Sequence, residues 1–266
     1  MNLIDVHAHL DHARFKEDLD KVIERARKAG VKLIITSGVN SRTNRLILDI
    51  AGRYPDIVRV SFGIYPLDAL AKEIESNEAD GFVRDIEEFN LDKELEWIEK
   101  NKDKCIAIGE CGLDYKWVTG KEKEQKEIFQ KVIETARKIN KPLIVHSRKA
   151  EADALELIEK SGIKNVIMHC FNGRKHLIKK ACELGFYFSI PPIITKLQHF
   201  QNLVSIVPIN QLLTETDSPY LSHLAGERNE PANVSVTIKE IAKIKKISEQ
   251  EAGDIIYNNA RRLFSF

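Results

Sequence analysis

The sequence predicts a single (β/α)8 barrel, an α/β fold (the TIM barrel) in which eight parallel strands alternate with helices. Three observations lead to this prediction. Eight short apolar runs recur along the chain, segments of helical periodicity separate them, and the length of 266 residues is close to the roughly 250 that are typical of such a barrel. The chain contains no Pro- or Ser-rich linker, so we expect one domain that spans residues 1–266.

Each expected strand is a short, nearly continuous apolar run, which is typical of strands buried on both faces in a parallel sheet. The expected strands are residues 3–6, 31–37, 56–64, 105–110, 142–146, 166–169, 185–190 and 211–217. A doubly wound open sheet is the structural alternative. However, no GxGxxG motif follows a strand, so the glycine pattern does not support a dinucleotide-binding fold.

Three of the intervening segments carry specific helix signals. Residues 18–29 place apolar side chains on one helical face, and Gly30 suits the C-terminal cap. Residues 122–139 repeat apolar side chains at helical spacing. The pattern Ser-Glu-Gln-Glu that begins at Ser248 is a capping box, which predicts a final helix through Arg262.

Residues 69–90 do not fit the alternation of strands and helices. This segment is acidic and has few apolar residues at periodic positions. We expect a long loop after the third strand, and loops of this length in compact domains are usually either functional lids or disordered segments.

The composition limits the class of partner. With 41 basic and 40 acidic residues, the formal charge is +1, so no global field attracts nucleic acid or an anionic membrane. If the substrate is a phosphate polymer, its attraction must be local or carried by a metal. Four cysteines without a CxxC pair, and no apolar run of the ~20 residues that span a bilayer, predict a reduced cytoplasmic protein that does not enter membranes.

The first candidate site is the motif Asp5-Val6-His7-Ala8-His9 at the end of the first expected strand. Alternate residues of a strand share a face, so His7 and His9 can point toward one centre. Imidazole nitrogens suit Zn, Mn, Ni or Fe. Taken alone, two histidines at this spacing often occur by chance, and a solvated or core pair remains the alternative.

Polar side chains of the metal-ligand type also end four other expected strands. Glu110, His146, His169 and Asp217 each follow an apolar run. In a (β/α)8 barrel these strand ends converge on one face, where active sites are built from several strands. His146 or His169 alone could be a strand-terminal histidine hydrogen-bonded to a loop, but the joint placement of these residues favours a metal site.

Six motifs in order along the chain resemble those of the TatD-type metal-dependent deoxyribonucleases, within the amidohydrolase superfamily of barrels. They cover nearly the whole sequence. The motifs are Asp5-Val6-His7-Ala8-His9-Leu10, Gly109-Glu110-Cys111-Gly112-Leu113-Asp114-Tyr115, Val145-His146-Ser147-Arg148, His169-Cys170-Phe171-Asn172-Gly173, Thr216-Asp217-Ser218-Pro219-Tyr220-Leu221 and Arg228-Asn229-Glu230-Pro231.

This resemblance implies a centre with two divalent metal ions. His7 and His9 would bind one ion together with Asp217, His146 and His169 would bind the second, and Glu110 would bridge the two. Asp217 would also be the general base. Mg, Mn, Zn and Ni are all compatible with ligands of these types. Asp5 would be a carboxylate that orients the ligands, and Asp114 would orient a ligand or stabilise its loop.

One position departs from the family pattern. Members usually carry histidine in the motif after the third strand, whereas this chain has Gly63-Ile64-Tyr65-Pro66. Tyr65 cannot replace an imidazole as a neutral ligand, but its hydroxyl could contact a substrate phosphate. The departure puts in doubt any role of the usual histidine in phosphate contact or proton transfer.

Further substrate contacts are expected from the loops at the barrel mouth. Arg148 and Arg228 could bind a phosphate with bidentate geometry, and a solvated loop arginine is the alternative for each. Tyr115 and Phe171 could stack on a base, with core packing as the alternative for Phe171.

The resulting hypothesis is a phosphodiesterase that acts on DNA, single-stranded or at an exposed end. An amidohydrolase-type barrel that cleaves a small ester, amide or phosphoester is the first alternative, since fold and ligands do not fix the substrate. A metal-binding scaffold barrel without turnover is the second.

Overall fold

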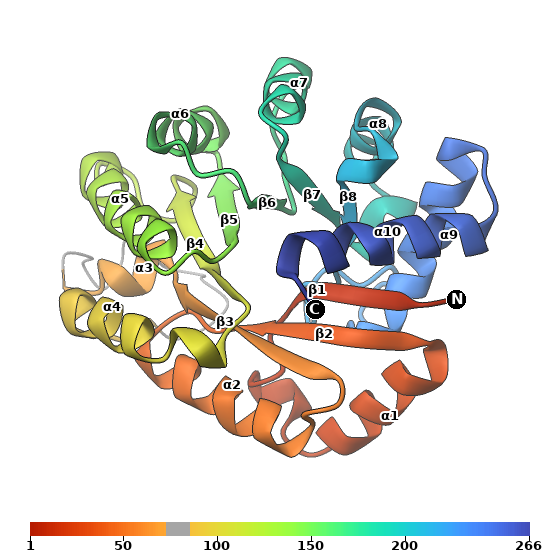
Figure 1. Cartoon of the computed structure of the whole chain (residues 1–266), viewed down its shortest axis with the longest axis horizontal. Helices are drawn as coiled ribbons and strands as arrows, with labels where there is room; N and C mark the ends of the chain where they lie inside the picture. The colour runs from red at the N-terminus through yellow and green to blue at the C-terminus, as the bar shows by residue number, and fades with distance from the viewer. Residues whose placement is uncertain (73–85) are drawn as a thin grey trace.

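The computed structural model describes residues 1–72 and 86–266. Within them, eight parallel strands form one sheet in sequence order from β1 to β8 (Figure 1). The strands are β1 (Leu3–Ala8), β2 (Val31–Ser37), β3 (Val58–Ile64), β4 (Ala107–Asp114), β5 (Leu143–Arg148), β6 (Val166–His169), β7 (Tyr187–Ile190) and β8 (Leu212–Thr214). The predicted (β/α)8 barrel is confirmed.

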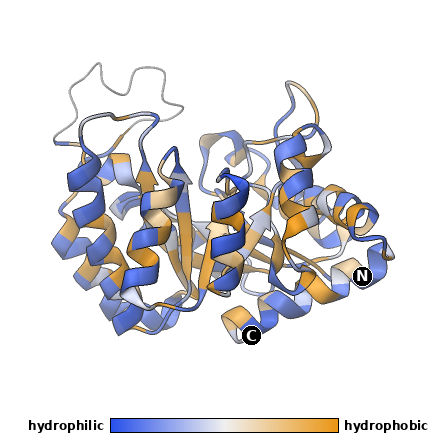
Figure 2. Ribbon diagram, turned by 90° about the horizontal axis from the view of Figure 1, so that it is seen from above, coloured by the Kyte–Doolittle hydropathy of each residue, from blue (hydrophilic) through white to orange (hydrophobic). Residues whose placement is uncertain are grey.

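Helices surround the strands, as Figure 1 shows. The α-helices are α1 (Leu19–Ala29), α2 (Ser41–Arg53), α3 (Pro66–Ala69), α4 (Leu91–Lys100), α5 (Glu122–Lys138), α6 (Glu151–Ser161), α7 (Lys175–Glu183), α8 (Gln198–Ile206), α9 (Val234–Lys245) and α10 (Glu249–Phe264). Short 3₁₀ segments are η1 (Ala13–Phe15), η2 (Lys102–Lys104), η3 (Pro192–Thr195), η4 (Ile209–Gln211) and η5 (Pro231–Asn233). In Figure 2 the central strands are largely orange and the helices are striped in orange and blue, as expected for amphipathic helices around an apolar sheet. None of the helices in the described residues combines the length and the apolar character that crossing a membrane requires.

The helix signals of the sequence agree closely with the structure. Gly30 ends α1 in the left-handed conformation, with φ 92°. Ser248 precedes α10, and its side-chain oxygen accepts a hydrogen bond from the backbone N–H of Glu251. This is one of the two hydrogen bonds of the expected capping box, the one from the N3 backbone N–H to the N-cap side chain. α10 itself continues two residues past the predicted end, to Phe264.

Four strands end at other residues than predicted. β1 and β5 each continue two residues further, to Ala8 and Arg148. β4 continues past Glu110 to Asp114, because its last residues still pair with β5, up to Asp114 opposite Arg148. β8 ends at Thr214, and Asp217 lies beyond it with a φ of 52°, which is incompatible with a strand. Of the segment 69–90, Ala69 ends α3 and residues 86–90 lead into α4, while residues 73–85 lie outside the described residues.

Hydrogen bonds between the end of β1 and the segment that follows β8 join the first and last parts of the barrel next to the predicted site. The backbone N–H of His9 donates to the carbonyl of Ser218 at 2.8 Å, and that of Asp217 donates to the carbonyl of His7 at 2.9 Å. The buried Asp5 carboxylate accepts from the backbone N–H of Thr216 at 2.9 Å and from its hydroxyl at 2.5 Å. These bonds fix the two histidines relative to Asp217.

Gly63 lies where β3 closely approaches the backbone of neighbouring segments. A methyl group on Gly63 would lie 1.8 Å from the carbonyl oxygen of Gly38 and 2.7 Å from the backbone nitrogen of Glu110. Both contacts are to backbone atoms, which cannot move aside as a flexible side chain can. Gly63 therefore allows β3 to pack beside the strand that carries Glu110.

We expect Gly63→Ala to destabilise the protein by at least about 2 kcal/mol, because the added methyl overlaps two backbone groups. Gly52→Ala is the matched control: Gly52 lies in α2 with open space around the new methyl, and the change should stabilise by about 0.5–1 kcal/mol. Urea unfolding of both variants measures the difference. Equal stability of Gly63→Ala and the parent would contradict the close approach.

Candidate metal centre and active-site cavity

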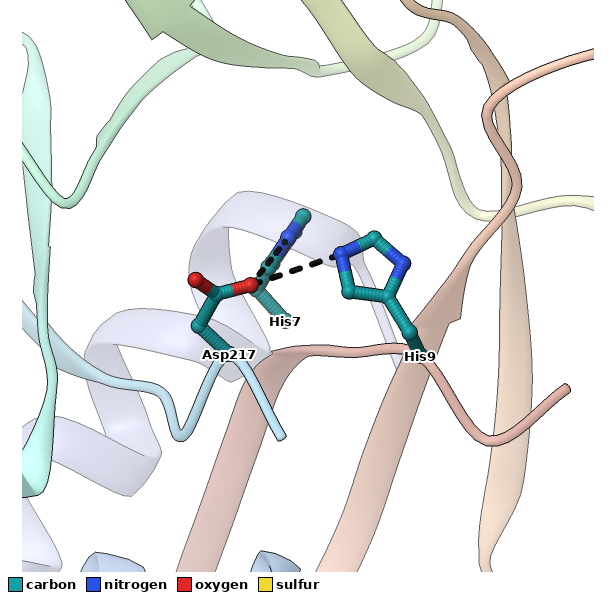
Figure 3. Close-up of side chains that lie close together, drawn as sticks. All are labelled: His7, His9 and Asp217. Carbon is teal, nitrogen blue, oxygen red and sulfur yellow. Dashed lines mark ion pairs between the residues drawn. The ribbon is translucent and has the colours of Figure 1, made fainter. Parts of the chain in front are cut away.

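Six side chains with metal-ligand chemistry converge at the barrel mouth. They come from five different strands or from the turns that directly follow them. Figure 3 shows the first group, in which the Nε2 atoms of His7 and His9 lie 3.5 and 3.4 Å from Oδ1 of Asp217. The six residues are those predicted as ligands: His7, His9, Glu110, His146, His169 and Asp217.

Glu110 lies between two pairs of histidines. Its Oε2 is 3.6 Å from Nε2 of His7 and 3.4 Å from Nε2 of His9. Its Oε1 is 2.9 Å from Nδ1 of His146 and 3.9 Å from Nε2 of His169. Each carboxylate oxygen therefore faces a different pair of imidazoles, which is the arrangement that a bridging carboxylate requires.

The other ring nitrogen of each histidine in the first pair contacts β2. Nδ1 of His7 lies 3.1 Å from the hydroxyl of Ser37, and Nδ1 of His9 lies 3.1 Å from the backbone carbonyl of the same residue. One residue thus orients both rings. The sequence reasoning missed Ser37, although it carries the signal used elsewhere: it is the polar residue that ends an apolar strand.

Buried carboxylates orient the second pair of histidines. Nδ1 of His169 lies 2.7 Å from Oε2 of Glu215, and Nε2 of His146 lies 3.0 Å from Oδ2 of Asp114. Each ring therefore directs its other nitrogen inward, toward Glu110. Sequence reasoning anticipated Asp114 as an orienting residue but missed Glu215, although Glu215 is an acidic residue inside the expected strand 211–217.

The ligand atoms fit a cation. Nε2 of His7 is fully buried and has no hydrogen-bond partner among the described residues. Buried polar atoms are rarely left unpaired, so this nitrogen requires a partner at the centre of the cluster. Two groups of three residues place their ligand atoms close together. Within each group, the ligand atoms all lie within 4.8 Å of one another. The groups are His7, His9 and Asp217, and His7, Glu110 and His169.

The electrostatics of the cluster also favour positive charge. Burial acts to lower the pKa of His7, but the interactions with Asp217 and Glu110 outweigh it and raise the pKa to about 9. Burial acts to raise the pKa of Asp217, but His7 and His9 lower it well below its ordinary value. His146, His7 and His9 likewise lower the pKa of Glu110 against the effect of burial. Both carboxylates thus remain ionised, and protons compete with a metal for the imidazoles.

A cavity of about 1170 Å³ opens onto this cluster. Arg148 lines it, with its guanidinium 5.6 Å from the centre of the Trp117 ring. Tyr65 also lines it, and its hydroxyl donates to Oδ2 of Asp114 at 2.9 Å and lies 3.3 Å from Nε2 of His146. Two of the predicted substrate contacts, Arg148 and Tyr65, therefore reach the cavity.

The other two predicted substrate contacts do not line this cavity, and each has a partner outside it. The hydroxyl of Tyr115 donates to the carboxylate of Asp153 at 2.9 Å, and Tyr115 does not line the cavity. Arg228 is also absent from the described lining, and its guanidinium donates to both carboxylate oxygens of Asp18 at 2.7 Å. Phe171 is buried against Phe188, in line with the core-packing alternative.

We expect Asp18→Asn to destabilise the protein by about 1 kcal/mol near pH 7, since it removes the paired charge of Arg228. The hydrogen bond from Arg228 lowers the pKa of Asp18 to about 2. The stabilisation is therefore complete above the ordinary pKa of 3.8 and is lost as the pH falls toward 2.

Urea unfolding at pH 7, 5 and 3 would test this, with the difference between parent and Asp18→Asn shrinking only at pH 3. Asp56→Asn is the control, because Asp56 forms a similar pair with Arg27 but is far more exposed. A loss for Asp56→Asn as large as for Asp18→Asn would contradict the role given to burial.

Comparison with known protein families places this chain among relatives of matching length. The profile of the family described as "TatD related DNase" matches residues 4–265. "Deoxyribonuclease TATDN3" of Homo sapiens is 35% identical over 268 residues, which cover 99% of this chain and 95% of the human protein. The "Uncharacterized metal-dependent hydrolase YabD" of Bacillus subtilis is 33% identical, with 98% of each chain covered.

Solved structures show the same fold. The TatD homolog YJJV from Escherichia coli superposes with a TM-score of 0.85 at 21% identity, covering 99% of this chain and 98% of the other. A hydrolase TatD family protein from Entamoeba histolytica gives a TM-score of 0.83 at 24% identity, again covering 99% and 98%. An uncharacterized amidohydrolase from Saccharomyces cerevisiae gives 0.82 at 16% identity, with coverage of 99% and 100%.

Proposed function

Because this chain belongs to the TatD-related DNase family of metal-dependent hydrolases, we propose that it hydrolyses phosphodiester bonds in DNA with two divalent ions. The observation that carries the proposal is the position of Glu110, whose two oxygens face two different pairs of histidines. Glu110 would thus be shared between the two ions, one held on each side of its carboxylate.

We assign His7, His9 and Asp217 to one ion and His146 and His169 to the other, with Glu110 shared. The ligand atoms of His7 also lie close to those of Glu110 and His169, so His7 borders both positions. Ions bound there would polarise the phosphodiester and make water a nucleophile at neutral pH. Mg, Mn, Zn and Ni all suit these mixed nitrogen and oxygen ligands.

Asp217 is the residue we assign to accept the proton of the attacking water. Its Oδ1 faces His7 and His9, while its second oxygen points away from both histidines (Figure 3). The lowered pKa of Asp217 keeps the carboxylate ionised, so it acts through its position beside the ions rather than through a high basicity.

The depth of the site favours a strand end or a single strand as substrate. His7, Glu110 and His169 are each at most 5% exposed, so a phosphate must enter the cavity to reach them. Arg148 lines the same cavity and offers a guanidinium to that phosphate. Since the whole chain has a charge of only +1, attraction of DNA depends on such local groups.

We expect Asp217→Asn to lower the turnover of a single-stranded DNA substrate by at least about 100-fold, because the proton acceptor is lost. EDTA should abolish activity in the parent. A panel of DNA, bis(p-nitrophenyl) phosphate, and carboxylic esters and amides measures both effects. Hydrolysis of only the esters or amides would favour an amidohydrolase-type substrate, and no hydrolysis by metal-loaded protein would favour a scaffold role.

We expect Glu215→Gln to weaken binding of Zn²⁺ or Mn²⁺ by about 10–100-fold, because His169 loses the charged partner that orients its ring. Isothermal titration of metal-free protein measures the affinity. Glu94→Gln is the matched control: Glu94 is also buried but pairs with Arg45 and Asn44, outside the metal centre. Equal metal affinity of Glu215→Gln and the parent would contradict the orienting role.

A further inference from the structure

The cavity at the metal centre continues along helix α2. Besides the metal-site residues, its lining includes six residues of this helix: Arg42, Thr43, Leu46, Asp49, Ile50 and Arg53. Five of them, all except Thr43, follow Arg42 at spacings of 4, 7, 8 and 11 residues or are Arg42 itself, which is the spacing of one face of an α-helix. Lys16, which follows η1, and Leu19, the first residue of α1, also line the cavity. The helices α1 and α2 are neighbours in Figure 1. We call the part of the cavity that is lined by these residues of α2 and by Lys16 and Leu19 the α2 groove.

The α2 groove combines positive ends with an apolar middle. Arg42 and Arg53 are 11 residues apart, which corresponds to about 16 Å along a helix. Leu46 lies between them and is 36% exposed, which is high for a large apolar side chain. The groove has three cations, counting Lys16, against the carboxylates of Asp11 and Asp49.

Both arginines already have partners, but these are surface ion pairs. Arg42 donates to Glu87 at 2.5 Å, and Arg53 donates to Asp20 at 3.4 Å. The side chains of both arginines are more than half exposed. Exposed pairs of this kind contribute about 0–1 kcal/mol, so a phosphate can replace the carboxylate at little cost.

We propose that the α2 groove binds the part of a single nucleic-acid strand that flanks the scissile phosphate. This inference rests on the proposed function. The groove is continuous with the metal centre, its cations match phosphates, and Leu46 and Ile50 offer an apolar surface to bases or sugars. At a phosphate spacing of about 3.4 Å for a stacked strand, about 16 Å corresponds to about five nucleotides, or fewer if the strand is extended.

The test compares substrates of different length in charge-reversal variants. Arg53→Glu should lower the ratio of kcat/KM for a ten-nucleotide DNA to that for a dinucleotide by about fivefold, because only the longer strand reaches this end of the groove. Arg27→Glu is the matched control. Arg27 is also an exposed arginine at the end of its helix, paired with Asp56, but it does not line the groove.

A binding measurement separates the groove from catalysis. In EDTA, the fluorescence anisotropy of a labelled ten-nucleotide DNA should show weaker binding to Arg53→Glu. The slope of the logarithm of the binding constant against the logarithm of the salt concentration should become smaller in magnitude by about 0.7 for each phosphate contact that is lost. Leu46→Asp should also weaken binding, whereas Leu197→Asp, at an exposed leucine of another helix end, should not.

The outcomes distinguish the two proposals. Equal effects of Arg53→Glu and Arg27→Glu, or no length dependence, would overturn the α2 groove while leaving the DNase function intact. If the metal-loaded parent cleaves neither the dinucleotide nor the ten-nucleotide DNA, the proposed function fails instead. Anisotropy that is unchanged in both Arg53→Glu and Leu46→Asp would overturn the groove independently of any activity.

Discussion

Two carboxylates at the bottom of a cavity impose the main constraint on this structure. An ionised carboxylate is costly to bury unless positive charge or hydrogen bonds compensate it. Glu110 is only 5% exposed, and the side chain of Asp217 is 16% exposed. Their surroundings supply imidazole nitrogens at 2.9–3.9 Å, and one of these, the buried Nε2 of His7, has no hydrogen-bond partner in the described structure. The cluster is therefore built to surround a cation.

The precision of the cluster depends on partners outside it. Ser37 orients two imidazoles, while Asp114 and Glu215 orient one each, so each ring has one nitrogen directed inward. Asp5 acts on the backbone instead, since its carboxylate bonds to the N–H and hydroxyl of Thr216 and joins the first strand to the segment after the last one. Asp5 and Thr216, which join the two ends of the barrel, thus lie within two residues of His7 and Asp217, which belong to the metal centre.

The sequence predicted the fold and the six ligand-type residues because both follow from patterns along the chain. Apolar runs mark buried strands, and polar residues at their ends must meet at one barrel face. The roles of Arg228 and Tyr115 could not be predicted in this way, since their partners are set by tertiary packing: Asp18 lies 210 residues from Arg228 in sequence. The α2 groove could not be predicted from the sequence either, because helix periodicity alone does not show which face of a helix borders a cavity.

Tyr65, which departs from the family pattern, is accommodated by contacts with its immediate neighbours. Its hydroxyl reaches Oδ2 of Asp114, the same oxygen that contacts His146, so the tyrosine joins the hydrogen bonds around one histidine without entering the group that faces Glu110. Its ring packs with Val39, Leu67 and Val118 in a small apolar cluster of its own. A side chain with an apolar body and a polar tip suits this place, since the body needs burial and the hydroxyl needs a partner. The geometry therefore connects Tyr65 to the orientation of His146 more directly than to a substrate phosphate.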